Sequence, residues 1–340
     1  MPTARLARPS QRDVAALAGV SRTTVSFVMN GVADAAKISP ETRARVWAAV
    51  EELGFRPNEI ARSLRSSRSN VLGLVTSEIA TTPHAVAIIK GAQETAFAHD
   101  KTLLIVDTDG RRDLDGETIT KMSRWQVEGL ILATDHHREL VPPDGIGQTP
   151  TILVNCFPAD GSLTSIVPDE RQGGCLATET LLAAGHRRIG FINGPDRFPA
   201  SVGRMRGYRD AHRAAGVDPD ERLIRVGDWW QESGFRHAAD LLGLSEPPTA
   251  LFCANDWMAM GAYDAVRERG LRIPGDVAII GFDNREQIAA HMRPRLSTVA
   301  LPYHDMGRMA VERLLATEQT GSTDVERLLV PCPLVTRESV

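Results

Sequence analysis

Side chains able to read the edges of DNA bases lie close together in residues 21–30, SRTTVSFVMN. Arg22 can hydrogen-bond guanine O6 and N7, Thr23 can contact several bases, and Phe27 can touch a thymine methyl group. Hydroxyl side chains suited to phosphate are those of Ser21, Thr24 and Ser26. Contacts to phosphate position a protein on DNA without specifying sequence. The segment is therefore predicted to expose a base-reading face. The alternative is a helix face that is simply solvated.

The first element needed to hold this face is a short helix that starts after Ser10. The Ser10 side chain can cap the helix, and Asp13 can reach back to the Ser10 amide. Val14, Leu17 and Ala18 then fall on one apolar face. Residues after Ser10 are therefore predicted to form a capped helix that packs through these three side chains.

A tight turn and a second capped helix complete the unit. Gly19 stands where the chain must turn sharply, a place that favours φ above zero, and Ser21 can cap the next helix. Ala15 is small where the two helices would cross most closely. The inward-facing residues predicted for the second helix are Val25, Val28 and Met29. This combination is typical of a helix-turn-helix, whose second helix enters the major groove. An ordinary helical hairpin is the alternative.

A third helix should follow, because Ser39, Pro40 and Glu41 are three successive helix-start signals. Its apolar face would hold Val46, Val50 and Leu53, and Gly54 would end it. Three short helices can bury a small shared core, so this helix is predicted to hold the base-reading helix in place.

Residues 55–68, FRPNEIARSLRSSR, combine linker composition with helical spacing. A proline interrupts the preceding helix, yet Ala61 and Leu64 continue a helical pattern. Leu64 lies between Arg62 and Arg65, and minor-groove proteins use an apolar wedge beside arginines to kink a duplex. The alternative is a frayed linker whose leucine packs on the rest of the chain.

Composition and charge distribution limit the class of protein. The 340 residues are 42% hydrophobic and 24% charged, as in an ordinary globular chain, and the length predicts two or three domains. Residues 1–68 hold 11 Lys and Arg against 6 Asp and Glu, although the whole chain has a net charge of −4. A basic head on an acidic body suits a module that meets phosphate.

The sequence also predicts a cytoplasmic protein. No apolar run approaches the ~20 residues that span a membrane. The basic N-terminus is not followed by the apolar core of a secretory signal. The four cysteines are widely spaced, which favours buried thiols over a disulfide framework or a zinc site.

The rest of the chain alternates between apolar runs and helix-length segments. The runs predicted as buried strands are 71–75, 102–106, 129–133, 151–154, 188–192, 250–253 and 277–282. Such alternation is typical of parallel sheets covered by helices on both faces, where ligands collect at the strand ends. Seven or more such units exceed one simple sheet, so two lobes with a cleft between them are predicted.

Motifs along the whole chain resemble one known family, the LacI/GalR (lactose and galactose repressor) family. They are DVAALAGVS, FRPN and ARSLR near the N-terminus, and GHRRIGFINGP, ANDWMAMGA and DVAIIGFDN in the body. The resemblance implies an all-α helix-turn-helix head at 1–57, a hinge at 58–70, and an α/β core of parallel sheets at 71–340, two-lobed like periplasmic sugar-binding proteins. The lobes would hold about 71–168 with 300–331, and about 169–299 with 332–340.

The resemblance also implies a role for each part. The protein would be a homodimeric regulator, a repressor rather than an activator, that binds a pseudo-palindromic double-stranded operator and a small-molecule effector such as a sugar or sugar derivative. In this family the hinge becomes helical only on operator DNA, and the leucine aligned with Leu64 enters the central base step. The residues predicted to contact DNA are Arg22, Thr23, Phe27, Ser21, Thr24, Ser26, Asn30, Ala61, Leu64 and Arg65.

Candidate effector contacts carry over position by position. Arg204 matches the family arginine that contacts effector, and a guanidinium suits hydroxyls or a carboxylate. Asp283 matches an acid that accepts ligand hydroxyls, and a structural ion pair is the alternative for both residues. Trp229 matches an aromatic position that stacks on sugar faces, and Asn255 ends a strand. Asn255 and its neighbour Asp256 could instead cap the next helix, and Asp256 is expected to be a cap rather than a ligand contact.

Two further positions in the predicted effector set are Thr82 and Asp169. Thr82-Pro83-His84 stands where many family members have Asn-Pro-Phe, so the aromatic ring that often stacks on a pyranose there is missing. The chemical class of the effector is therefore open. Asp169 and its neighbour Glu170 are either ligand contacts or hydrogen-bonding residues where the chain crosses between lobes.

Signatures of catalysis are not found in the sequence. It has no G-x-S-x-G elbow, Walker A loop or H-E-x-x-H motif, and His136-His137 lack metal-ligand spacing. We therefore expect no enzyme activity, cofactor, metal site or membrane contact. The alternatives are an α/β enzyme with a DNA-binding head, a transcriptional activator of the same architecture, and a periplasmic binding protein, which fits the body only. The chain closes on VTRESV without heptads, so a dimer is expected and not a tetramer.

Overall fold

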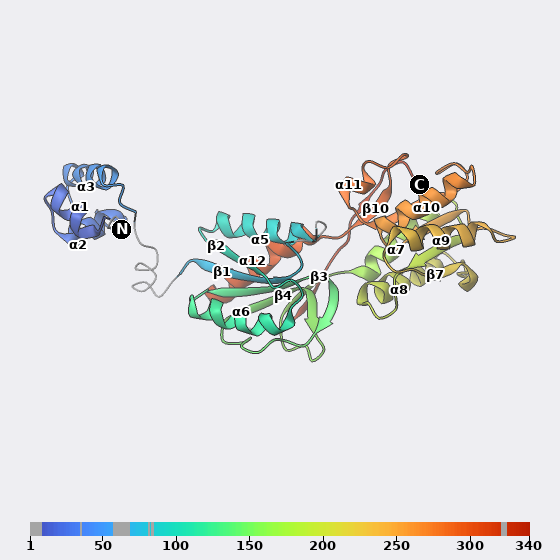
Figure 1. The fold of residues 1–340 in the computed structure, drawn as a ribbon, viewed down its shortest axis with the longest axis horizontal. Coiled ribbons are helices and arrows are strands. Elements are labelled where there is room, and N and C mark those ends of the chain that lie inside the picture. The colour runs from blue at the N-terminus through green and yellow to red at the C-terminus, as the bar shows by residue number, and fades with distance from the viewer. Residues whose placement is uncertain (1–8, 35, 57–68, 81, 83–84, 321–324) are drawn as a thin grey trace, which may run out of the picture. The chain divides into compact units, whose positions relative to one another are not determined.

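The computed structural model of the protein describes residues 9–34, 36–56, 69–80, 82, 85–320 and 325–340 (Figure 1). The chain divides into two compact units, residues 1–69 and 70–340, which we call the head unit and the core unit. The hinge residues Ala61, Leu64 and Arg65 lie outside the described residues, so their predicted DNA contacts stay predictions.

The described part of the head unit contains three helices, α1 (Gln11–Ala18), α2 (Arg22–Met29) and α3 (Pro40–Glu52). Ser10 donates its amide to Asp13 Oδ2 over 2.8 Å, as the predicted cap requires. Gly19 has a φ of 64°, and the Ser21 hydroxyl accepts the Thr24 amide at 3.0 Å. The caps and the turn between α1 and α2 are therefore confirmed.

The apolar face predicted for α1 is wrong at one position. Leu17 is 47% exposed, whereas Ala15 and Val14 are buried. The helix turns its small residue inward because α1 must pack closely against its neighbours. The buried head core consists of Val14, Ala15, Ala18, Val25, Val28, Ala33, Val46, Ala49 and Phe55.

The first sheet of the core unit has the strand order β11-β5-β4-β3-β1-β2, with all pairs parallel. Its strands are β1 (Val71–Ser77), β2 (Thr102–Asp107), β3 (Gly129–Leu140), β4 (Thr151–Pro158), β5 (Ser165–Pro168) and β11 (Arg327–Val330). Helices α5 (Val86–Ala98) and α12 (Tyr303–Thr320) share one hydrophobic cluster on this sheet. Helix α6 (Arg112–Arg124) belongs to a second cluster, through Ile119 and Met122.

The second sheet has the order β12-β10-β9-β8-β6-β7, and only β12 runs antiparallel to its neighbour. Its strands are β6 (Ile189–Asn193), β7 (Ile224–Val226), β8 (Ala250–Cys253), β9 (Ala278–Asp283), β10 (Ser297–Ala300) and β12 (Leu334–Val335). The helices that follow these strands or precede them are α7 (Glu170–Ala183), α8 (Pro199–Ala214), α9 (Gln231–Leu242), α10 (Asp256–Glu268) and the short α11 (Glu286–Ala289). Figure 1 shows the two sheets as separate layered lobes of the core unit.

The predicted fold class, a helical head with a two-lobed α/β core, is confirmed. The chain passes between the sheets three times, after β5, after β10 and after β11. Each predicted apolar run forms a strand, but β3 is longer than expected and reaches Leu140. Its extension pairs again with β4 after a register shift between Ala133 and Arg138. This irregular stretch holds Asp135, His136 and His137.

Within the described residues, no helix combines the length and apolar character needed to cross a bilayer.

Candidate functional site

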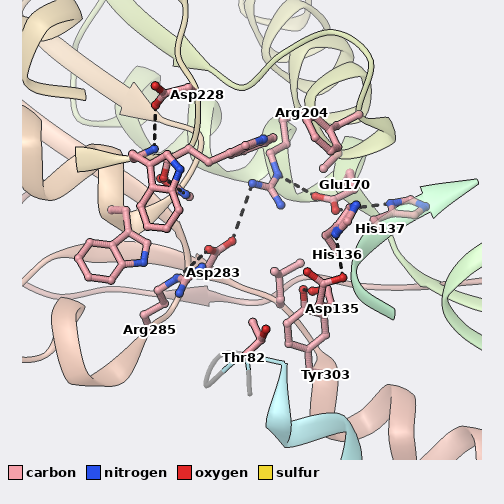
Figure 2. Close-up of a pocket in the computed structure, with 17 residues that line it drawn as sticks. Thr82, Asp135, His136, His137, Glu170, Arg204, Asp228, Asp283, Arg285 and Tyr303 are labelled. Carbon is pink, nitrogen blue, oxygen red and sulfur yellow. Dashed lines mark hydrogen bonds and ion pairs between the residues drawn. The ribbon is translucent and has the colours of Figure 1, made fainter. Parts of the chain in front are cut away.

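A cavity of about 530 Å³ lies in the core unit and is lined by elements attached to both sheets. We call it the cleft. Its lining residues are Thr82, Asp135, His136, His137, Glu170, Phe198, Ala200, Arg204, Asp228, Trp229, Trp230, Asn255, Trp257, Asp283, Arg285, Leu301 and Tyr303 (Figure 2). Its volume falls in the range of roughly 300–1,000 Å³ that is usual for small-molecule sites.

Arg204 of α8 is the buried cation of the cleft, only 3% exposed. Its Nε donates to Glu170 Oε2 over 2.8 Å, and its Nη1 donates to the Ala254 carbonyl and lies 3.9 Å from Asp283 Oδ1 (Figure 2). Its guanidinium also lies 3.7 Å from the centre of the Phe282 ring. Arg204 is therefore fixed by two carboxylates and an aromatic face.

Burial of Glu170 would by itself raise the pKa of its carboxyl group, because burial disfavours the charged form. The Arg204 guanidinium and the nearby His137 more than offset burial and hold that pKa below its ordinary value. The same pairing raises the pKa of Arg204 in spite of its own burial. Both groups are thus charged at neutral pH.

Two glycines bring α7 and α8 close enough for this pair to form. A Cβ on Gly174 would lie 2.5 Å from the Arg204 carbonyl oxygen, and one on Gly207 would lie 2.1 Å from the Arg171 carbonyl oxygen. Both distances are too short for a side chain. The first turn of α7, with Glu170, can therefore meet the Arg204 side chain directly.

The end of β9 supplies a second charged group. Asp283 has a φ of 102°, and its Oδ2 accepts Arg285 Nε at 3.2 Å. Behind it, buried Asp256 accepts the Arg285 amide at 2.6 Å and the Thr298 hydroxyl at 2.7 Å. Burial, together with the negative charge of Asp283, raises the pKa of Asp256 to about 8. Asp256 therefore keeps its proton at neutral pH.

The irregular part of β3 carries three polar residues into the cleft. His136 Nδ1 lies 2.9 Å from Asp135 Oδ1, and the His136 ring meets Phe198 edge-on with centroids 5.6 Å apart. Burial would raise the pKa of Asp135, but His136 holds it below its ordinary value. His137 is 90% buried, its Nδ1 lies 3.5 Å from Glu170 Oε1, and neither of its ring nitrogens has a hydrogen bond within the described structure.

Aromatic rings form much of the remaining wall, and Trp229 is central among them. The Trp229 carbonyl accepts Asn255 Nδ2 at 2.9 Å, while Asn255 Oδ1 accepts the Met258 amide at 2.8 Å. Asn255 is therefore the cap of α10. The expectation that Asp256 would also cap the helix is wrong, because its carboxyl group turns inward to the Arg285 amide and Thr298.

Five of the six predicted effector residues line the cleft: Thr82, Arg204, Trp229, Asn255 and Asp283. Asp169 does not line it, because its side chain caps α7 by accepting the Gln172 amide at 2.9 Å. Sequence reasoning missed several residues that the structure places there, among them Asp135, His136, Phe198, Arg285 and Tyr303. The only signal for the histidine pair was its position directly after a strong apolar strand.

The second site is the exposed face of α2. Arg22 and Thr23 are exposed, and Phe27 is 39% exposed. The remaining polar side chains are tied to their own helix: the Ser21 and Thr24 hydroxyls lie 2.9 Å apart, and Asn30 Nδ2 donates to the Ser26 hydroxyl. This face thus offers a guanidinium, a hydroxyl and an aromatic ring without competing bonds to the described residues of the head.

Metal binding and disulfide bonding can be examined in the described part of the chain. No group of three or more His, Cys, Asp or Glu side chains there is arranged to hold a metal. The four cysteines are free, three of them buried and Cys175 half-buried.

Comparison with known proteins identifies both units. Residues 11–58 match the family described as bacterial regulatory proteins, lacI family, and residues 178–340 match a periplasmic binding protein-like domain. The HTH-type transcriptional repressor PurR of Proteus mirabilis is 34% identical over 334 residues, covering 97% of this chain and 96% of the relative. The ribose operon repressor of Escherichia coli K12 is 32% identical over 336 residues, covering 97% and 99%.

Solved structures agree with these relatives. The lac repressor dimer bound to operator and the anti-inducer ONPF is 28% identical, covers 97% of this chain and 98% of its own, and has a TM-score of 0.79. The complex of the transcriptional regulator CelR with cellobiose is 31% identical, covers 98% and 100%, and has a TM-score of 0.66.

Proposed function

The chain belongs to the lacI family of bacterial regulatory proteins and is a DNA-binding transcriptional regulator controlled by a small-molecule effector, and we propose that this effector binds in the cleft. Arg204 and Asp283 would hold its hydroxyl groups, and Asn255 would add a polar contact. Trp229 would support one face of its ring. Thr82 would approach from the side of the first sheet.

The observation that carries this proposal is that the lining of the cleft comes from both sheets. Asp135 and Tyr303 belong to elements of the first sheet, whereas Arg204 and Asp283 belong to elements of the second. A ligand that contacts all four residues must bridge the two lobes. Its binding would therefore favour one arrangement of the lobes, and a ligand shifts an equilibrium by its differential affinity for the two states.

The head would bind operator DNA through α2. Arg22, Thr23 and Phe27 would contact base edges, and the hydroxyls of Ser21, Thr24 and Ser26 would approach phosphate. By likeness to the lac repressor, whose structure is described as a dimer on operator, we propose a homodimer that binds a pseudo-palindrome. The hinge residues Ala61, Leu64 and Arg65 would contact DNA between the half-sites.

The finer assignments follow from the same likeness. The relatives named above are repressors, so repression is favoured over activation. None of them carries the name of an enzyme, and we propose that the cleft binds without catalysis. A protein that binds chromosomal operators would act in the cytoplasm.

DNA recognition is tested with sites selected by the full chain from a randomised duplex pool. Arg22→Ala should weaken binding to the selected site by about 1–3 kcal/mol, because a bidentate arginine–guanine contact is lost. Its affinity for unrelated DNA should change much less. Fluorescence anisotropy at several salt concentrations measures both affinities. Equal losses on selected and unrelated DNA would contradict a base-reading role for Arg22.

Effector binding is tested by a thermal-shift screen of sugars, nucleosides and small acids, followed by calorimetry on any hit. Asp283→Asn should weaken a hit by about tenfold or more, because a charged acceptor of ligand hydroxyls is lost, while binding to the selected DNA without ligand is retained. Asp240→Asn, a matched change at an exposed position on α9, should leave ligand affinity unchanged. A hit that Asp283→Asn does not weaken would place the site elsewhere.

A further inference from the structure

We propose that the cleft takes an uncharged, hydroxylated ring ligand and rejects phosphorylated or carboxylated ones, and that Glu170 sets this preference by occupying Arg204. The inference rests on the proposed function of the cleft and specifies its ligand. Glu170 is then an anion of the chain itself that stands where a ligand anion would otherwise bind.

Both guanidiniums of the cleft already have carboxylate partners. Arg204 Nε is bound to Glu170 and its Nη1 lies near Asp283, while Arg285 Nε is bound to the other oxygen of Asp283 (Figure 2). An incoming phosphate or carboxylate would have to displace one of these groups. The displaced carboxylate would then remain buried without its cation, which is costly.

Helix N-termini, the usual alternative for binding anions, are filled in the same way. Glu170 is the first residue of α7, and Asp256 is the first residue of α10. At α9, Asp228 Oδ1 accepts the Trp230 amide just before the helix begins. The helices α7 and α9 thus each have a carboxylate of the chain at their positive end, while the start of α10 is capped by the Asn255 side chain and followed by the protonated Asp256.

The charge balance of the lining points in the same direction. Four carboxylates line the cleft, those of Asp135, Glu170, Asp228 and Asp283, against the two guanidiniums. Asp256 lies directly behind Asp283 and keeps its proton, because burial and then the negative charge of Asp283 raise its pKa. A second anion brought into the cleft would meet the same repulsion.

What the cleft offers instead suits an uncharged ring. Carboxylate oxygens accept hydroxyl hydrogens. His137 Nε2 is buried without a hydrogen bond in the described structure, while its Nδ1 faces Glu170. The aromatic residues Phe198, Trp229, Trp257 and Tyr303 provide flat apolar surface for the ring itself. Hydroxyl groups on an apolar ring would satisfy both kinds of wall.

The test uses inorganic phosphate as the probe, because it does not depend on knowing the natural ligand. Tryptophan fluorescence of the full chain reports on the cleft, where Trp229, Trp230 and Trp257 lie. Phosphate should give no saturable signal with the wild-type chain. Glu170→Gln should create a saturable phosphate site, at least about tenfold tighter than any wild-type signal, because Arg204 then lacks its closest counter-ion.

Three further variants make the result specific. Glu179→Gln removes the same charge from α7 outside the cleft and should behave like the wild type. The double variant Glu170→Gln with Arg204→Gln removes both members of the buried pair and should lose the gained site. If Glu170→Gln lowers the melting temperature so far that it cannot be titrated, Glu170→Asn provides the same charge change with a smaller side chain.

The thermal-shift screen provides a second test of the inference. It compares matched uncharged and anionic compounds, such as ribose and ribose 5-phosphate, or glucose and glucuronate. Stabilisation should come from the uncharged member of a pair. Three outcomes would each overturn the inference. The first is saturable phosphate binding by the wild type that Arg204→Gln abolishes. The second is tighter binding of the anionic member of a pair, and the third is a failure of both Glu170 variants to bind phosphate more tightly than the wild type. These outcomes leave the effector role of the cleft standing, whereas a hit indifferent to Asp283→Asn removes that role.

Discussion

Asp256, which lies behind the cleft, illustrates how its charged residues depend on their neighbours. It is fully buried, its carboxyl group faces Thr298 and the Arg285 amide, and Asp283 lies nearby. Its pKa is about 8 against an ordinary value of 3.8. In the unfolded chain the group therefore ionises near pH 4, while in the folded chain it keeps its proton until about pH 8.

The stability of the core should therefore fall as pH rises between these two values. The folded state binds one more proton than the unfolded state in this window, so this group lowers the free energy of unfolding by about 1.4 kcal/mol per pH unit. The contribution is complete below pH 4 and is lost as pH passes the folded pKa. Asp256→Asn imitates the protonated side chain and should make stability less dependent on pH.

Thermal or urea unfolding of both proteins between pH 5 and pH 8.5 measures this difference. The wild type should lose stability relative to Asp256→Asn at every step toward pH 8. Parallel curves for the two proteins would mean that Asp256 is ionised in the folded state across this range.

At the residue scale, sequence and resemblance found Arg204 and Asp283, but not Arg285 or the pairing of Arg204 with Glu170. Arg204 and Asp283 matched family positions, and both line the cleft. That Glu170, and not a ligand, occupies Arg204 Nε depends on how closely two helices approach, which no local pattern encodes. The prediction that Leu17 is buried was wrong for a related reason. Sequence periodicity cannot tell which of several neighbouring residues is small enough to lie where two helices cross closely.

At the scale of elements, the α7–α8 contact positions the cleft. Gly207 lies against the Arg171 carbonyl of α7, and a Cβ there would come within 2.1 Å of it. Backbone cannot yield as a flexible side chain can, so the helices would have to separate. Arg204, one turn earlier on α8, would then move away from Glu170.

Gly207→Ala should therefore destabilise the core by about 1–3 kcal/mol, as overpacking does, and weaken ligand binding as well. Gly116→Ala on α6 is the matched control, because its nearest neighbour would be the Asp144 carbonyl oxygen at an ordinary 3.4 Å. The control should be neutral or slightly stabilising. Urea unfolding and calorimetry measure both effects, and unchanged stability in Gly207→Ala would show that the helices can separate without cost.

Sequence patterns predicted long elements better than short ones. Runs such as 250–253 and 277–282 formed central strands because they are apolar throughout, as strands buried on both faces must be. The edge strands β7 and β12 have only three and two residues, too few for a periodic signal. The extension of β3 was missed because polar residues follow its apolar run, and the extension depends on renewed pairing with β4.

At the scale of the whole molecule, a basic head unit and an acidic core unit are joined in one chain. The charge composition of the two parts of the sequence indicated this division. In the structure, the helix-turn-helix belongs to the head unit and the two sheets belong to the core unit. Neither unit alone explains regulation, because we propose that α2 binds DNA and that the cleft binds a metabolite. Regulation requires that occupancy of one site change the affinity of the other.

Such coupling must be reciprocal, since both affinities belong to one thermodynamic cycle. If a ligand changes DNA affinity by some factor, DNA must change ligand affinity by the same factor, typically about 5–150-fold. The sign of the effect distinguishes an inducer from a corepressor. Its size does not depend on which of the two affinities is measured.

The most direct measurement is calorimetric titration of the full chain with a ligand from the screen, with and without saturating amounts of its selected DNA site. The ligand dissociation constant should change by the factor that the ligand imposes on DNA binding in anisotropy. Asp283→Asn should weaken ligand binding in both titrations without weakening DNA binding in the absence of ligand. A ligand affinity that stays the same whether or not DNA is bound would contradict control of DNA binding through the cleft.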